Sequence, residues 1–161
     1  MASSKSDEWE TPQNLFDKLD AEFHFTLDPC CQAYNNKCLK YYTKKENGLG
    51  QSWAGETVFC NPPYGKAIGQ WVKKCWEEFN ENDVTIAMLI PSRTDTKWFH
   101  KYILGQATEI RFIQGRLKFV NRTFPSWRLD GNYKISPAPF PSMIAIYNPN
   151  KKNGTCCLTT Y

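Results

Sequence analysis

Apolar residues along the chain follow helical spacing in some segments and strand-like runs in others. Between Ile68 and Phe79 they recur every three or four positions, which predicts one amphipathic helix. A near-continuous apolar run at 84–90 follows it and is typical of a strand buried inside a parallel sheet. An earlier helix is expected to open at Thr11-Pro12, because threonine can cap a helix and proline fits its first position.

Shorter apolar runs predict the remaining elements. Strands are expected at 23–27, 39–43, 57–60, 109–114, 117–120 and 143–147, and a helix around 97–104. Residues 121–141 are rich in proline, arginine and aromatic side chains and are predicted to form a long loop. Strands that alternate with helices indicate an α/β fold with a mostly parallel sheet and flanking helices. The last two strands predict an antiparallel edge, since no helical pattern separates them.

The length of 161 residues suits one domain. We expect that domain at 9–148, after a disordered polar segment at 1–8 and before a peripheral tail at 149–161. The chain has no apolar stretch of about 18 residues, so no membrane span is expected. Its polar start also lacks the apolar region of a secretory signal. These features predict a cytoplasmic protein.

Positive charge is concentrated in one segment. The formal net charge is +4, yet six basic residues and a single acid fall between positions 111 and 134, interleaved with five aromatic residues. This combination suits a polyanion with stackable bases, although a solvated basic loop would have the same composition. Segment 111–141 is therefore the expected nucleic-acid contact. Its candidate residues are Arg116, Lys118, Arg122, Trp127, Arg128 and Lys134.

Seven cysteines are present, an odd number without paired C-x-x-C spacing. Only two histidines could add imidazole ligands, so no zinc site and no other metal site is predicted. The cysteines are interpreted as reduced, small apolar residues of the interior.

The most specific motif is Asn61-Pro62-Pro63-Tyr64, directly after the apolar run at 57–60. Each proline fixes a φ angle, and Pro62 biases Asn61 away from helical geometry, so the turn holds its carbonyl groups in preset directions. Asn61 offers an acceptor oxygen, Pro62 a carbonyl group and Tyr64 a flat ring. A planar ligand with an amino group, such as a nucleobase, suits this set, although Asn-Pro pairs also occur in ordinary turns.

Three of the predicted strands end at polar or turn-forming residues. Asp28, Asn61 and Pro91 each follow such an end. Ligands bind beyond the carboxyl ends of the strands in sheets of this kind, so the three positions are expected to share one cleft.

An ordered series of segments extends the Asn-Pro-Pro-Tyr motif over roughly residues 8–147. In this order the series resembles the phage-type DNA N-6-adenine methyltransferases, the Dam-like family of small phage and prophage enzymes. The segments are 9–12, 27–31, 47–49, Trp53, 59–65, 89–91, 93–96, Trp98-Phe99 and 115–119.

The resemblance implies a Rossmann-like class I methyltransferase fold, S-adenosylmethionine as the methyl donor and adenine in double-stranded DNA as the acceptor. It also implies a setting such as phage DNA methylation or restriction-modification. The catalytic motif would be Asn61, Pro62, Pro63 and Tyr64, acting on the 6-amino group of an adenine turned out of the duplex. The implied donor-binding residues are Thr11, Pro12, Asp28, Pro29, Cys30, Asn47, Leu49 and Asn61.

Within that set, Thr11-Pro12 resembles the element at the methionine end of the donor. Asp28 resembles the acid near its ammonium group, and segment 47–49 the part near its adenine. The alternative, purely structural interpretations are a helix cap for Thr11-Pro12 and an Asx turn for Asp28 before Pro29.

The chain departs from the wider methyltransferase pattern in two places. The glycine-rich turn usual after the first strand is absent, with Gln32 and Tyr34 at the positions where glycines are expected. Asn47 stands where an aspartate is expected, which weakens one hydrogen-bond acceptor.

Two other functions remain open from the sequence. The same pair of acceptors would suit an RNA guanine or a protein glutamine as methyl acceptor. A nucleic-acid-binding module without catalysis is the second alternative, motivated by the missing glycine-rich turn. The target sequence and the choice between monomer and homodimer are not encoded in any recognisable motif.

Overall fold

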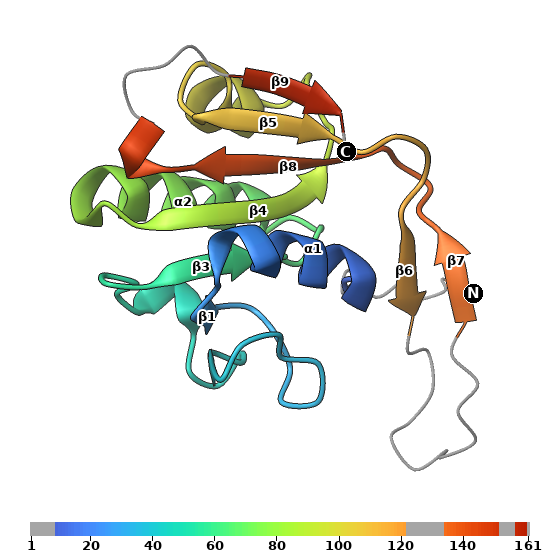
Figure 1. The fold of residues 1–161 in the computed structure, drawn as a ribbon, viewed down its shortest axis with the longest axis horizontal. Coiled ribbons are helices and arrows are strands. Elements are labelled where there is room, and N and C mark those ends of the chain that lie inside the picture. The colour runs from blue at the N-terminus through green and yellow to red at the C-terminus, as the bar shows by residue number, and fades with distance from the viewer. Residues whose placement is uncertain (1–8, 122–133, 152–156, 161) are drawn as a thin grey trace.

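The computed structural model describes residues 9–121, 134–151 and 157–160. Within these residues, seven strands form one sheet in the order β2-β1-β3-β4-β8-β5-β9 (Figure 1). The strands are β1 (Leu27–Asp28), β2 (Lys40–Tyr41), β3 (Thr57–Cys60), β4 (Thr85–Pro91), β5 (Glu109–Phe112), β8 (Ser142–Tyr147) and β9 (Cys157–Thr160). The predicted mixed α/β architecture is confirmed.

The sheet is parallel apart from one strand. β2, β1, β3 and β4 are mutually parallel, whereas β8 runs antiparallel to both β4 and β5. The expected antiparallel edge is therefore wrong in its position, since the reversed strand lies inside the sheet. The tail contributes β9, which pairs in parallel with β5 and forms the outer edge.

Of the last two predicted strands, that at 143–147 lies in this sheet as β8, whereas that at 117–120 does not. β6 (Lys118–Asn121) leaves it and pairs antiparallel with β7 (Lys134–Pro137) in a separate hairpin. The long loop predicted at 121–141 is thus wrong for β7, a four-residue strand whose only strong β-former is Ile135. Figure 1 shows the hairpin beyond the carboxyl ends of β4 and β5.

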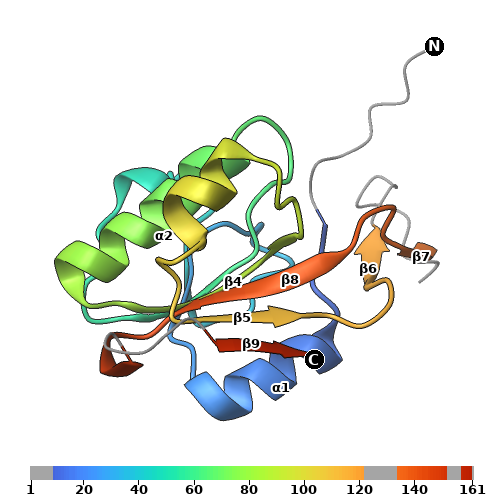
Figure 2. The ribbon, with the colours of Figure 1, turned by 90° about the horizontal axis from the view of Figure 1, so that it is seen from above.

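Helices cover both faces of the sheet (Figure 2). α1 (Gln13–Phe23) packs on one face, and α2 (Ile68–Asn82) with the short π-helix η2 (Phe99–Ile103) packs on the other. The helix predicted around 97–104 is confirmed, since helical geometry begins at residue 97 and continues as η2 to Ile103. None of the described helices is both long and apolar enough to cross a bilayer.

Alternation along the central strands builds the two cores. In β3, Phe59 packs in the α1 core, whereas Val58 and Cys60 pack in the α2 core. β4 and β8 alternate in the same way, and almost all of these side chains are fully buried. Burial of each large aliphatic side chain contributes roughly 1.5–3 kcal/mol to stability, so this three-layer centre holds the strand ends in place.

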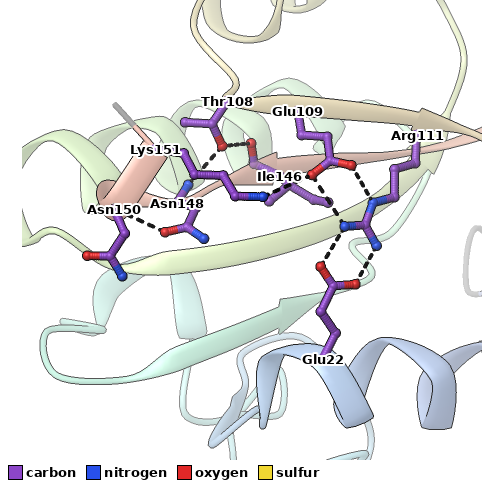
Figure 3. A network of polar contacts seen from close by, with 8 residues as sticks. All are labelled: Glu22, Thr108, Glu109, Arg111, Ile146, Asn148, Asn150 and Lys151. Carbon is purple, nitrogen blue, oxygen red and sulfur yellow. Dashed lines mark hydrogen bonds and ion pairs between the residues drawn. The ribbon is translucent and has the colours of Figure 1, made fainter. Parts of the chain in front are cut away.

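A network of charged groups joins α1 to β5 (Figure 3). Arg111 on β5 donates two hydrogen bonds to the Glu22 carboxylate, at 2.7 and 2.6 Å, and its Nε donates to Glu109 at 2.7 Å. Lys151 lies 3.7 Å from Glu109. Arg111 is only 8% exposed, so this member of the basic segment is neutralised inside the fold and unavailable to DNA.

Candidate active site

The main cleft lies where β1 and β3 end, beside the segment that precedes α1. Its volume is about 270 Å³, close to the lower end for small-molecule sites. Eight predicted site residues line it: Thr11, Asp28, Pro29, Cys30, Asn47, Asn61, Pro62 and Pro63. The lining does not include Pro12, Leu49 or Tyr64. It also lacks Pro91, so the prediction that this position shares the cleft with Asp28 and Asn61 is wrong for Pro91.

The Asn61 amide is held by the chain segment before α1. Its Nδ2 donates to the main-chain carbonyl of Trp9 and to the Thr11 hydroxyl oxygen, the latter at 2.8 Å. A main-chain carbonyl can only accept, so the Trp9 contact fixes which end of the amide points toward this segment. The Asn61 Oδ1 is left on the other side of the amide.

The orientation leaves a buried acceptor without a partner. Asn61 Oδ1 has no hydrogen bond among the described residues, although the atom is shielded from solvent. An unsatisfied buried polar atom costs about 1–3 kcal/mol, so its presence beside a cleft needs an explanation. A ligand that donates an N–H group would satisfy it.

Thr11 has a different role from the helix cap that its sequence position predicts. α1 is capped by Pro12, without any side-chain capping bond, and the main-chain carbonyl of Pro12 accepts from the N–H groups of Leu15 and Phe16. The helix thus begins next to Thr11-Pro12 as predicted, but Pro12 stands at the N-cap instead of the first helical position, and the capping role predicted for Thr11 is wrong. Thr11 is 3% exposed, and its hydroxyl is used on Asn61 instead.

Tyr64 is anchored away from the cleft lining. Its hydroxyl donates to the Leu89 carbonyl at 3.1 Å. Its ring meets Phe119 and Phe140 edge to face, at centroid distances of 6.0 and 5.5 Å. Trp9 contacts the same two phenylalanines, so the Asn-Pro-Pro-Tyr turn, the N-terminal segment and the hairpin share one aromatic cluster.

Asp28 is a buried carboxylate at the end of β1, with 4% exposure. Its oxygens accept from the main-chain N–H of Lys37 at 3.0 Å and from that of Cys30 at 3.4 Å. Burial raises the pKa of Asp28 from its ordinary 3.8 to about 6, against the opposing effect of these two donors. The longer contact, from Cys30, is the Asx turn considered above. The shorter contact holds the main chain at Lys37, nine residues further along the chain.

The segment at 47–49 closes the cleft through close backbone packing. Asn47 has a φ of 54°, and the Gly48 carbonyl accepts from Trp53 Nε1 at 3.0 Å. A Cβ atom on residue 48 would lie 2.0 Å from the Pro29 carbonyl oxygen, so only glycine fits here. Leu49 packs against the α2 core instead of the cleft.

Several residues line the cleft that sequence reasoning did not select. They are Trp9, Glu10, Cys31, Gln32, Tyr34, Asn35, Lys37, Thr43, Lys44, Phe59, Trp71 and Val120. Those at 31–37 occupy the place of the missing glycine-rich turn, and their position directly after β1 is the signal that could have found them. Side chains thus replace a bare backbone turn on this wall.

The hairpin borders the cleft through β6. The Val120 N–H donates to the Glu10 carbonyl at 3.2 Å, and Val120 lines the cleft. Of the predicted DNA contacts, Arg116 and Lys118 are exposed just before and at the start of β6. Arg122, Trp127 and Arg128 lie outside the described residues, as does the side chain of Lys134 at the start of β7.

The described cysteines are free thiols. Cys38, Cys60 and Cys75 are buried, and Cys30 and Cys31 are partly buried, as predicted for reduced interior residues. The Cys30 Sγ lies 3.6 Å from the Cys60 Sγ, next to the Asn61 turn.

One comparison with known proteins covers nearly the whole chain. The model of the DNA N-6-adenine-methyltransferase (Dam) family matches residues 1–160. A search of the curated proteins found no match. The resemblance carried by the ordered motifs is confirmed by the family match. The chain belongs to the DNA N-6-adenine-methyltransferase (Dam) family.

Proposed function

We propose that the protein is an S-adenosylmethionine-dependent, site-specific DNA adenine methyltransferase that modifies the exocyclic 6-amino group of a flipped adenine. The observation that carries this proposal is the unpartnered Asn61 Oδ1 in the turn that follows β3. The donor and the flipped base are inferences from that site and from the family, whose name supports adenine methylation in DNA.

The cleft residues fit a sulfonium nucleoside with an amino-acid end. Asp28 supplies a carboxylate for an ammonium group, and Gly48 keeps the cleft wall free of a side chain where the loop approaches Pro29. Thr11 and Asn61 line the same space. When bound, S-adenosylmethionine would supply an electrophilic methyl group on a positively charged sulfur.

The chain's own contribution is to make the amino nitrogen of adenine a better nucleophile. Its lone pair is delocalised into the ring, so the free base reacts slowly. Asn61 Oδ1 and the Pro62 carbonyl are proposed to accept the two amino hydrogens, which favours tetrahedral geometry at nitrogen and stabilises the positive charge of the transition state. Holding the nitrogen close to the methyl group supplies much of the remaining acceleration.

The target base must leave the duplex to reach this turn. Flipping costs a few kcal/mol, and stacking on an aromatic ring returns about 1–3 kcal/mol. Tyr64 is the proposed stacking ring, although its hydroxyl is tied to Leu89, so the base would meet a ring that is already fixed in place. Arg116 and Lys118, exposed beside the cleft, are proposed phosphate contacts.

We also propose that the sheet is Rossmann-like. The four parallel strands from β2 to β4 place Asp28 and Asn61 at their carboxyl ends, where ligands bind in such folds.

Isotope transfer tests the function directly. The purified protein is incubated with methyl-tritiated S-adenosylmethionine and, in parallel, with unmethylated double-stranded DNA, RNA or protein. We expect label in DNA alone, and N6-methyladenine as the modified nucleoside after digestion and mass spectrometry. Sequencing that detects modified adenines would then give the target site.

The alternatives give different results in the same experiment. Label in RNA or in a protein glutamine would transfer the proposal to another acceptor. Binding to DNA without label, together with no calorimetric binding of S-adenosylmethionine or its demethylated product, would establish an inactive binding module instead.

A further inference from the structure

We propose that Lys37 binds the carboxylate of the donor's amino-acid end and forms, with Asp28, a receptor for both of its charges. This inference rests on the proposed function, because it assigns a residue to the donor cleft. Lys37 belongs to the segment that replaces the glycine-rich turn, and no motif identified it.

The main chain of Lys37 is held in position by Asp28, the acid proposed to bind the ligand's ammonium group. Its main-chain N–H donates to Asp28 Oδ2 at 3.0 Å, which fixes the residue on the wall formed by the end of β1. Lys37 lines the cleft, and its side chain extends to α1, where Nζ donates to Gln13 Oε1 at 2.8 Å. The ammonium group therefore lies at the first residue of α1, two positions after Thr11, which also lines the cleft.

The charges on this wall match an α-amino acid. Asp28 is a buried carboxylate, and the positive charge of Lys37 acts on it, lowering the pKa of Asp28 in part. An ammonium and a carboxylate on one carbon atom would each find an opposite charge here. A ligand with only one of these groups would leave one side chain without its counterpart.

The present contact of Lys37 with Gln13 is exposed and involves a neutral amide oxygen. Exposed contacts of this kind contribute little to stability, so this contact can be exchanged for another at small cost. A ligand carboxylate would be a stronger acceptor for the ammonium group than an amide, because both partners would then carry opposite charges.

A comparison of two ligands isolates the carboxylate. Calorimetry would measure the affinity for S-adenosylhomocysteine and for its decarboxylated analogue, which keeps the ammonium group, in the wild-type protein and in Lys37→Met. We expect Lys37→Met to weaken S-adenosylhomocysteine binding about tenfold or more, the scale of one lost charged hydrogen bond. Binding of the decarboxylated analogue should change less than about twofold, because that ligand never makes the contact.

Three further variants make the result specific. Lys37→Arg should recover much of the affinity for S-adenosylhomocysteine, because it restores the charge. Lys45→Met removes a lysine that is exposed and absent from the cleft lining, and it should have no effect on either ligand. Lys44→Met tests the other lysine of the cleft. Circular dichroism and thermal melts confirm that each variant is folded.

The outcomes separate this inference from the proposed function. Equal losses for both ligands in Lys37→Met, or a carboxylate-specific loss in Lys44→Met alone, would overturn the role of Lys37 while the donor site stands. If the wild-type protein binds neither ligand, the proposed function itself is wrong and this inference falls with it.

Discussion

Two buried polar clusters attach the N-terminal part of the chain to the sheet, and they differ in how completely their groups are paired. On β5, Arg111 is bonded to both Glu22 and Glu109. After β3, Asn61 donates twice to the segment before α1 but keeps an unpartnered Oδ1 among the described residues. The first arrangement favours stability, whereas the second costs stability and leaves one acceptor available.

The comparison also concerns charge. The Arg111 guanidinium holds the pKa of Glu22 below its usual value, whereas burial raises the pKa of Asp28 beside the cleft. One region is more stable with its acid ionised, and the other is less stable with its acid ionised. This contrast is typical of a structural ion pair set against a binding carboxylate.

Removal of the unpartnered acceptor should have the largest effect. Asn61→Ala is expected to lower the rate of DNA methylation by about 10²–10³-fold, the scale of one lost charge-stabilising contact in a transition state. The change also removes the two bonds from Nδ2, so we expect a stability loss of about 1–2 kcal/mol. Single-turnover kinetics and urea unfolding measure the two effects separately.

The matched control is Asn80→Ala, which removes an exposed asparagine whose Nδ2 donates to Trp76 on α2. It should leave the methylation rate unchanged. An Asn61→Ala rate within a few-fold of wild type would show that the acceptor is dispensable.

Removal of Arg111 from its ion pairs should lower stability and leave ligand binding unchanged, whereas the main effect expected for Asn61→Ala is on the methylation rate. Arg111→Met leaves Glu109, with a side chain 10% exposed, without its main counter-charge. We expect unfolding to become easier by about 2–4 kcal/mol, below the full cost for buried pairs because Glu22 is 44% exposed. Affinity for S-adenosylhomocysteine, measured below the melting temperature, should be unchanged.

Glu22→Gln in the same network is the milder companion, with an expected cost of about 1 kcal/mol or less. A loss of donor affinity in either variant at full folding would show that the two clusters are coupled.

A substitution at residue 48 tests the cleft by a steric change that alters no charge. Gly48→Ala places a methyl group against the Pro29 carbonyl oxygen, so the loop must move and destabilisation of about 1–3 kcal/mol is expected. Because Pro29 lines the cleft, donor affinity should fall as well. Gly69→Ala is the control, since its Cβ would make only ordinary contact with Trp98 at 3.6 Å, and calorimetry should find its affinity at the wild-type value.

We expect the smallest effect from the pH dependence of stability. It also tests whether Asp28 and Glu22 act with opposite sign. Asp28 binds its proton more tightly in the folded state, so its contribution is favourable below pH 3.8 and is lost as pH rises through about 6. Glu22 acts in the reverse sense, because its favourable contribution is lost as pH falls through its lowered pKa. Asp28→Asn should therefore stabilise the protein at pH 7.5 but not at pH 4.

The same proton should govern donor binding. An ammonium group needs the ionised carboxylate, so affinity for S-adenosylhomocysteine should rise about tenfold between pH 5 and pH 7. In Asp28→Asn the affinity should be low and nearly flat over this range. A flat profile in the wild-type protein would contradict the assignment of Asp28 to the ammonium.

The sequence predicts best those elements whose apolar stripe or run is visible in their own residues. β4 begins and ends within one residue of expectation, and α2 begins at the predicted residue and ends three residues later, because an apolar run or stripe extends along most of their length. The strand predicted at 23–27 is wrong for most of its residues. Phe23 ends α1, and Phe25 stacks on Phe23 and packs on Phe59, so its apolar character serves an aromatic cluster before β1 begins.

The candidate site divides in a similar way. Asp28 and Asn61 follow strand ends, and the sheet brings strand ends together, so their meeting in the cleft could be predicted. The positions of Leu49 and Tyr64 depend on packing against residues distant in sequence, which a local motif does not contain. The role of Thr11 was hidden for the same reason, since its partner is 50 positions away.

The hold of Trp9 and Thr11 on the Asn61 amide has a consequence for how the protein is made and handled. A side-chain amide is a two-position rotor, and a half-turn would present a hydrogen-bond donor where an acceptor is required. The first residues of the folded domain therefore set the polarity of a group that emerges from the ribosome some fifty residues later. An affinity tag fused close to Trp9 would disturb the contacts that orient the Asn61 amide, so the tag is better placed at another position.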